Sequence, residues 1–179
     1  MMDKKYMISK VRTIPDWPKK GIMFRDITTL IKDYKAFEMS IQDFVDRYKD
    51  KKIDYIVGVE SRGFIIGAAV AHLLKVGFIP VRKKGKLPAD TISVEYELEY
   101  GTACLEIHND ALKKDDRVVI MDDLLATGGT MIAASQLVQK LGGVVHECAF
   151  IINLPELKGE ERLHNSGLKT YCQIEFEGE

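Results

Sequence analysis

Residues 118–134, VVIMDDLLATGGTMIAA, place two adjacent acids and a glycine-rich turn between an apolar run and a helical pattern. The start of a helix offers unpaired N–H groups and the positive end of the helix dipole, and together these bind phosphate. Gly128 and Gly129 allow the backbone to approach such a ligand closely. We therefore expect a phosphate to be held by Ala126, Thr127, Gly128, Gly129 and Thr130.

The acids Asp122 and Asp123 require a different ligand, because carboxylates repel a phosphate. Carboxylate oxygens accept hydrogen bonds from hydroxyl groups, so the pair suits the ribose of a sugar that carries the phosphate. Simple helix capping is the commoner explanation for an Asp-Asp or a Gly-Gly doublet alone. The complete string is much rarer by chance, and it contains neither GxxxxGK[ST] nor GxGxxG, which disfavours P-loop NTPases and dinucleotide-binding folds.

Cations near two other predicted strand ends indicate a second anion. In GVESRGF, residues 58–64, a strand precedes a helix-opening turn whose backbone donors could bind an anion together with the guanidinium of Arg62. In RKKGKLP, residues 82–88, four cations come just after a strand and could neutralise a leaving group. These cations are Arg82, Lys83, Lys84 and Lys86. A capped helix with a surface arginine and a solvated charge run are the alternatives.

The elements that would position these motifs alternate along the chain. Apolar residues at three- and four-residue steps predict helices over 37–48, 63–74 and 131–141, the last closed by Gly142 and Gly143. Short apolar runs predict buried strands over 55–59, 78–81, 118–121 and 148–152. The alternation indicates an α/β fold with a mostly parallel sheet flanked by helices, whose ligands collect at the carboxyl ends of the strands. Residues 93–100 alternate strictly between apolar and polar, which predicts a two-faced ribbon.

The bulk composition excludes several classes of protein. The 179 residues, 46% of them hydrophobic, fit one domain, and 26 Lys and Arg against 27 Asp and Glu give no basic footprint for nucleic acid. No segment approaches the ~20 apolar residues of a membrane span or resembles a signal peptide. We therefore expect a cytoplasmic protein with neither nucleic acid nor membrane as a partner. Its three cysteines lack metal-type spacing and are expected to be buried or free thiols of a reducing compartment: Cys104, Cys148 and Cys172.

The string VVIMDDLLATGGT resembles the phosphoribosyl pyrophosphate (PRPP) motif of the type I phosphoribosyltransferase family. Four more stretches agree in order and spacing with the adenine-using branch of that family: WPKKGIMFRDIT, GVESRGF, RKKGKLP and LEYGTACLEIH. The similarity runs from about residue 10 to 176. It implies the type I phosphoribosyltransferase fold in a single domain over 1–179, with an N-terminal hood over about 1–30 and a flexible catalytic lid over about 82–103.

The resemblance also implies the reaction. The 5-phosphoribosyl group would pass from PRPP to adenine, giving AMP and pyrophosphate by an oxocarbenium-like displacement, with Mg²⁺ as cofactor. The ion would be held mainly through PRPP, so no all-protein metal site is expected. A homodimer is implied as well, in which Arg82 or Lys83 could reach the neighbouring subunit. A strained or cis peptide is expected near Glu60.

Roles for individual residues follow from the same resemblance. Pyrophosphate would be bound by Ser61, Arg62, Arg82, Lys83 and Lys86, and adenine by Met23, Phe24 and Arg25. Phe24 would stack on the purine while the backbone around Met23 reads its edge, and Arg25 matches a position near the pyrophosphate side. Glu99, in LEYG, matches the acid near the purine and is the expected catalytic residue; Glu95 and Glu97 are expected to be exposed. The family often has proline where this chain has Lys19 or Lys20, which affects the path of the hood.

Two other functions remain open at this point. The first is a phosphoribosyltransferase for another base, such as xanthine or a pyrimidine. The second is a PRPP-sensing regulatory protein of the same fold. Such regulators usually add a DNA-binding domain or a basic face, and the sequence contains neither signal.

Overall fold

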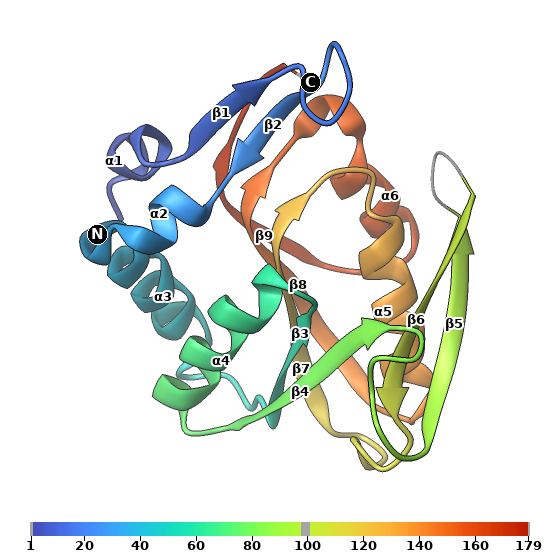
Figure 1. The fold of residues 1–179 in the computed structure, drawn as a ribbon. Coiled ribbons are helices and arrows are strands. Elements are labelled where there is room, and N and C mark those ends of the chain that lie inside the picture. The colour runs from blue at the N-terminus through green and yellow to red at the C-terminus, as the bar shows by residue number, and fades with distance from the viewer. Residues whose placement is uncertain (1, 98–100, 179) are drawn as a thin grey trace.

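A seven-stranded sheet forms the centre of the computed structural model, which describes residues 2–97 and 101–178 (Figure 1). Its strand order is β5-β6-β4-β3-β7-β8-β9. The strands are β3 (Tyr55–Val59), β4 (Gly77–Lys83), β5 (Thr91–Glu97), β6 (Thr102–His108), β7 (Arg117–Leu125), β8 (Val144–Asn153) and β9 (Thr170–Glu175). The pairs among β4, β3, β7, β8 and β9 are parallel, whereas β5 and β6 form an antiparallel ribbon at one edge. The mostly parallel α/β sheet is confirmed.

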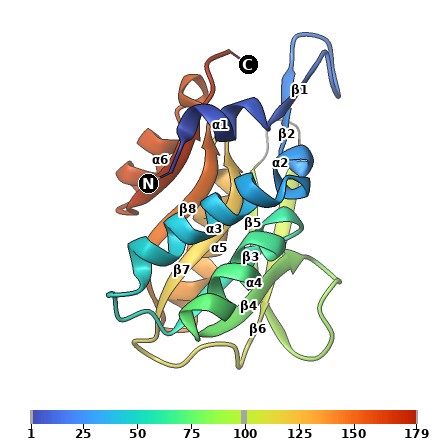
Figure 2. The same cartoon turned by 90° about the vertical axis from the view of Figure 1, so that its left-hand side faces the viewer.

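Helices cover both faces of this sheet. Helices α3 (Tyr34–Tyr48) and α4 (Arg62–Leu74) lie in front of it in Figure 2, and α5 (Gly129–Lys140) lies behind it. Successive residues of a strand point to opposite faces, so Ile56 belongs to the core under α3 and α4, and Val57 to the core under α5. The predicted helices owe their formation to these two apolar layers.

Shorter elements surround the carboxyl ends of the central strands. The N-terminal part contains α1 (Lys4–Ser9), the antiparallel hairpin of β1 (Arg12–Pro15) and β2 (Met23–Asp26), and α2 (Thr28–Lys32). Between β8 and β9 lie the 3-10 helix η1 (Pro155–Leu157) and α6 (Gly159–Asn165). In Figure 1 the hairpin and α6 lie at the top, where β7 and β8 end. No helix in the described ranges has the length and apolar character needed to cross a bilayer.

Two expected strand ends are wrong. Strand β7 does not end at Met121 but continues to Leu125, so Asp122 and Asp123 lie within the strand. The pairing of β7 with β8 continues past Met121, with Asp122 opposite Phe150. The length of the strand is therefore underestimated when only its apolar residues are counted. Similarly, Arg82 and Lys83 belong to β4 instead of following it, because β4 extends to pair with β6 there.

The cysteines are free thiols, as expected. Burial raises the pKa of the Cys148 thiol to about 12, and burial likewise raises that of Cys172 to about 12. Both thiols are therefore neutral and poorly nucleophilic near pH 7.

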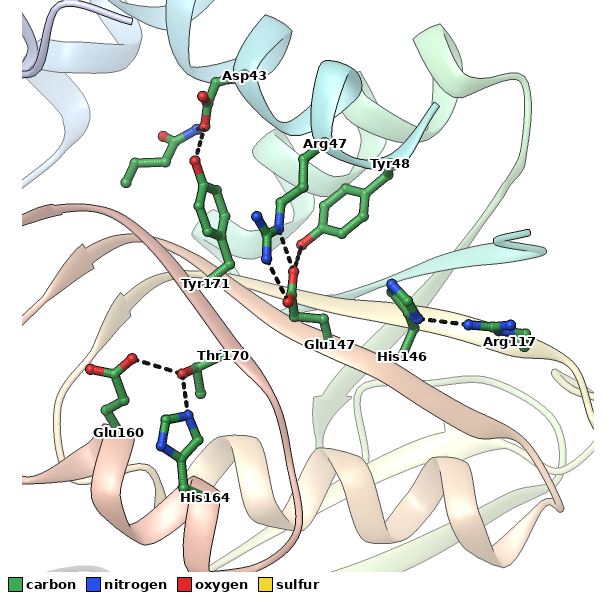
Figure 3. A network of polar contacts seen from close by, with 11 residues as sticks. Asp43, Arg47, Tyr48, Arg117, His146, Glu147, Glu160, His164, Thr170 and Tyr171 are labelled. Atoms are coloured by element: carbon green, nitrogen blue, oxygen red, sulfur yellow. Dashed lines mark hydrogen bonds and ion pairs between the residues drawn. The ribbon is translucent and has the colours of Figure 1, made fainter. Parts of the chain in front are cut away.

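A buried carboxylate fastens α3 to β8 (Figure 3). Glu147, 6% exposed, accepts hydrogen bonds from Arg47 Nε at 2.6 Å and Nη2 at 2.7 Å, and from the Tyr48 hydroxyl at 2.7 Å. Burial by itself raises the pKa of Glu147, but these donors outweigh burial and hold the pKa below its ordinary value of 4.5. A group whose pKa is lowered on folding stabilises the fold above its unfolded pKa, and that stabilisation is lost as the pH falls.

We expect Glu147→Gln to lower the free energy of unfolding at pH 7 by about 2–3 kcal/mol, because the amide cannot accept from three donors at once. The difference from the unsubstituted protein should shrink as the pH falls below about 4.5, the ordinary pKa. Urea unfolding at several pH values measures both effects. Asp46→Asn is the matched control, since the Asp46–Lys49 pair is exposed and is expected to contribute less than about 1 kcal/mol. Equal stabilities for Glu147→Gln and Asp46→Asn would contradict the prediction.

Candidate active site

The residues expected to bind phosphate lie where β7 passes into α5 (Figure 1). The loop is shorter than the sequence indicates: Gly129 and Thr130 already belong to the first turn of α5. Gly128, at the helix N-cap, has φ of 82°, a left-handed conformation that glycine adopts without strain, and no side chain caps the helix. The first N–H groups of a helix have no partner within it. We name residues 126–130 the phosphate cradle; they line a small cavity of about 90 Å³.

Gly159, which belongs to none of the sequence motifs, packs directly against the backbone of this cradle. A Cβ on Gly159 would lie 2.1 Å from the carbonyl oxygen of Ala126, so no larger residue fits without moving the cradle. A Cβ on Gly128 would likewise lie 3.1 Å from the Gly159 carbonyl oxygen. The only available signal was a glycine just before a helical pattern.

The β5–β6 ribbon reaches the cradle from the other side. Thr130 Oγ1 donates a hydrogen bond of 3.3 Å to the Tyr96 hydroxyl, and a Cβ on Gly129 would lie 3.5 Å from the Glu97 carbonyl oxygen. Glu95 and Glu97 are exposed, as expected, and alternate with inward-facing residues. Glu99, the expected catalytic residue, lies outside the described residues.

The two acids occupy different environments. Asp123 is 4% exposed, and its carboxylate accepts a hydrogen bond from Arg62 Nε within an ion pair. Asp122 is half-buried, and its Oδ1 accepts a hydrogen bond of 2.9 Å from the backbone N–H of Asp123. Burial and then the nearby charge of Asp123 raise the pKa of Asp122 above its ordinary value, against the opposing effect of Arg62. The negative charge of Asp122 is therefore less well neutralised than that of Asp123, which has Arg62 as its ion-pair partner.

The expected pyrophosphate loop follows β3. A cis peptide joins Glu60 to Ser61, as the resemblance implied, and α4 begins at Arg62 with no side-chain cap. The structure brings Arg62 next to Asp123, which joins this loop directly to the acids of β7. Because α4 begins there with uncapped N–H groups, the loop presents backbone donors as expected.

Glu60, expected only as the place of the unusual peptide bond, also connects this loop to the basic segment through its side chain. Its carboxylate accepts from the Lys83 backbone N–H at 3.0 Å and from Arg82 Nε at 3.1 Å. Burial raises the pKa of Glu60, but these two donors bring it below the ordinary value overall. Arg82 also donates from Nη1 to the carbonyl oxygen of Lys86 at 3.0 Å, so its guanidinium is held within the chain.

The expected adenine residues lie on β2. The rings of Phe24 and Trp17 meet edge to face with their centroids 4.4 Å apart. Arg25 is directed to the C-terminal segment: it donates to Thr13 Oγ1 at 2.7 Å and to the Glu177 carbonyl oxygen at 2.9 Å. The structure thus ties Arg25 to β1 and the chain end rather than to the pyrophosphate loop.

The sequence and the fold are similar to those of known proteins. Residues 28–176 match the family model described as a phosphoribosyl transferase domain. An adenine phosphoribosyltransferase from Chlorobium luteolum is 59% identical over 96% of this chain and 98% of its own. The crystal structure of the adenine phosphoribosyltransferase from Thermoanaerobacter pseudethanolicus has a TM-score of 0.93 at 50% identity, covering 97% of this chain and 100% of that one.

A third similar protein was solved with ligands. The adenine phosphoribosyl transferase from Trypanosoma brucei, in complex with AMP, pyrophosphate and ribose-5-phosphate, has a TM-score of 0.89 at 31% identity and covers 96% of this chain and 79% of that one. A cradle at the carboxyl edge of a mostly parallel sheet, with the family match, defines the class as the phosphoribosyltransferases. The chain belongs to this family, and within it to the adenine phosphoribosyltransferases.

Proposed function

We propose that the protein transfers the 5-phosphoribosyl group from PRPP to adenine, giving AMP and pyrophosphate. The observation that carries the proposal is the phosphate cradle, joined to the pyrophosphate loop through the ion pair of Arg62 and Asp123. A substrate with a phosphate at one end and a pyrophosphate at the other matches these two connected anion sites. The ligands of the Trypanosoma brucei relative support the same assignment.

In the proposed reaction the purine N9 attacks C1′ while pyrophosphate departs, through a transition state with oxocarbenium character. The cradle fixes the 5′-phosphate, and Asp122 accepts hydrogen bonds from the ribose hydroxyls. Arg62, Lys83 and Lys86 stabilise the negative charge that develops on pyrophosphate. Catalysis rests on positioning and electrostatics, with no covalent intermediate.

The hairpin of β1 and β2 supplies the proposed base site. Phe24 stacks on the purine, and the ring of Trp17 packs edge to face against the ring of Phe24 and so fixes its orientation. Backbone groups around Met23 read the purine edge. A 6-oxo base would leave their hydrogen-bonding groups unpaired, which favours adenine over hypoxanthine.

Magnesium is part of the proposal, and the donor set fits it. Asp122 and Asp123 are adjacent carboxylates, and among the described residues only Arg62 forms an ion pair with either of them, through Asp123. A cation would therefore offset negative charge that the protein leaves uncompensated there. Asp122 and Asp123 would meet the ion on its ribose side, while PRPP and water supply most of its ligands. When bound, the ion would offset the charge of the pyrophosphate.

A prediction for Glu99 follows from its proposed place beside the purine. Glu99→Leu should lower kcat by about 10²–10⁴, the usual contribution of a positioned acid or base, with little change in the KM for PRPP. The matched control is Glu95→Leu, which removes an exposed acid of β5 and should retain kcat within about threefold. Turnover by Glu99→Leu close to that of the unsubstituted protein would reject the assignment.

The test of the function is a panel of bases offered with PRPP and Mg²⁺. Adenine should give AMP and pyrophosphate, while hypoxanthine, xanthine and uracil should react at least ~100-fold more slowly. Faster reaction with xanthine or a pyrimidine would favour the enzyme for another base. PRPP binding without catalysis, together with a PRPP-dependent gel shift, would favour the regulatory protein.

The proposed assembly is a cytoplasmic homodimer. Arg82 is committed to Glu60 and to the Lys86 carbonyl oxygen, so Lys83, whose side chain is exposed, is the better candidate to reach the neighbouring subunit. A fully active monomer in sedimentation would contradict the dimer.

A further inference from the structure

Arg162, on α6, lies beside the phosphate cradle although it belongs to none of the recognised motifs. Its Nη1 is 3.8 Å from the position that a Cβ would take on Gly129, the first residue of α5. The side chain is exposed, and no described residue forms a hydrogen bond or ion pair with its guanidinium. The guanidinium of Arg162 thus lies beside the cradle with its N–H donors available.

The backbone that carries Arg162 is fixed to the cradle. Gly159, three residues earlier, packs against the Ala126 carbonyl oxygen, and the next residue, Leu163, is fully buried beside Gly128. Residues three apart on a helix share a face, so Arg162 lies on the side of α6 that faces the cradle. Its placement therefore follows from the same contacts that shape the cradle.

The neighbouring acids on α6 do not form an ion pair with the guanidinium of Arg162. Glu160 accepts a hydrogen bond of 2.8 Å from the Thr170 hydroxyl (Figure 3). Glu161 is exposed and forms no ion pair with Arg162. The guanidinium of Arg162 therefore keeps its donors accessible to a ligand bound in the cradle.

The chemistry of the cradle favours a cation at this place. Residues 126–130, ATGGT, contain no positive side chain, so a phosphate dianion there would meet only backbone dipoles and hydroxyls. The carboxylates of Asp122 and Asp123 stand nearby and oppose it. A guanidinium can donate two parallel charge-assisted hydrogen bonds to a phosphate, and these are stronger than bonds from neutral donors.

We propose that Arg162 binds the 5′-phosphate of PRPP and AMP as a side-chain ligand supplied from α6. The proposal rests on the proposed function, and it adds a residue to the phosphate site that the glycine-rich motif does not contain. Its role is in binding, so it should act on the affinity for phosphorylated ligands and on KM rather than on kcat.

Calorimetric titration of Arg162→Ala with AMP, PRPP and adenine tests this. Affinity for AMP and PRPP should fall by about 10- to 30-fold, the loss expected for a charge-assisted contact at a partly exposed site, while affinity for adenine changes less than threefold. Arg162→Lys keeps the positive charge but lacks the two parallel donors of a guanidinium. Its affinity for AMP and PRPP should lie between those of Arg162→Ala and the unsubstituted protein. Lys169→Ala, an exposed cation after α6, removes the same charge and should bind like the unsubstituted protein.

Three results would contradict the role of Arg162 as a ligand of the 5′-phosphate. Arg162→Ala that binds AMP within twofold of the unsubstituted protein would overturn the proposal, as would an equal loss of AMP and adenine affinity. An equal effect of Lys169→Ala would overturn it too, because the loss would then reflect net charge. If the unsubstituted protein bound neither AMP nor PRPP, the proposed function itself would fail, which is a separate result.

Discussion

Thr127→Glu is expected to weaken PRPP and AMP binding by at least ~100-fold while the protein stays folded. Thr127 is half-buried and lines the cavity of the cradle, so a carboxylate there would meet the 5′-phosphate at close range in a partly desolvated site. Attraction by the amides of the α5 N-terminus would be opposed by repulsion between like charges. Calorimetric titration with AMP gives the affinity, and thermal unfolding reports the fold.

Thr127→Gln separates charge from size. Glutamine has nearly the same volume as glutamate but no charge, so it should lose no more than about tenfold in AMP affinity. If both variants lost the same affinity, the cause would be steric and the cradle would not be shown to hold an anion. If Thr127→Glu bound AMP normally, the phosphate would have to lie elsewhere.

Arg62→Met should have the second large effect, and on two properties at once. The loss of the cation proposed to face the leaving group is expected to lower kcat by about 10²–10³. The same change leaves Asp123, 4% exposed, without its ion-pair partner. Because the Arg62 side chain is 42% exposed, we expect only about 1–3 kcal/mol of lost stability. Steady-state kinetics and urea unfolding measure the two losses.

The double variant Arg62→Met with Asp123→Asn distinguishes these effects. Asparagine removes the unpaired buried charge, so much of the lost stability should return, whereas kcat should stay low because the cation is still missing. A double variant no more stable than Arg62→Met would show that the ion pair is not the source of the instability. A kcat for Arg62→Met within fivefold of the unsubstituted protein would exclude Arg62 from the pyrophosphate site.

Much of the fold could be predicted because burial leaves periodic signals. The three- and four-residue steps from Phe37 to Tyr48 reflect a helix packed on one face, and the alternation after Ser93 reflects a ribbon with one side buried. The glycines at 128 and 129 marked the turn into α5 correctly. The hairpin of β1 and β2 was not predicted as strands, since two four-residue strands carry too few residues for alternation to appear.

The parts of the site that sequence reasoning missed depend on contacts between distant residues. Asp122 and Asp123 looked like a strand end because acids rarely continue a buried strand, yet Asp123 is buried with Arg62 as its partner, 61 residues earlier. Glu60 holds the basic segment, and Gly159 supports the cradle 33 residues beyond Ala126. Neither partner can be read from local spacing, because the pairing is set by how β3, β4, β7 and α6 meet.

A crystal structure of the complex with AMP would show where the phosphate and the ribose bind. We expect the phosphate oxygens within hydrogen-bonding distance, roughly 2.7–3.2 Å, of backbone N–H groups in residues 126–130, and a ribose hydroxyl donating to Asp122 or Asp123. AMP bound with its phosphate away from the α5 N-terminus, or with its ribose out of reach of both carboxylates, would contradict the account.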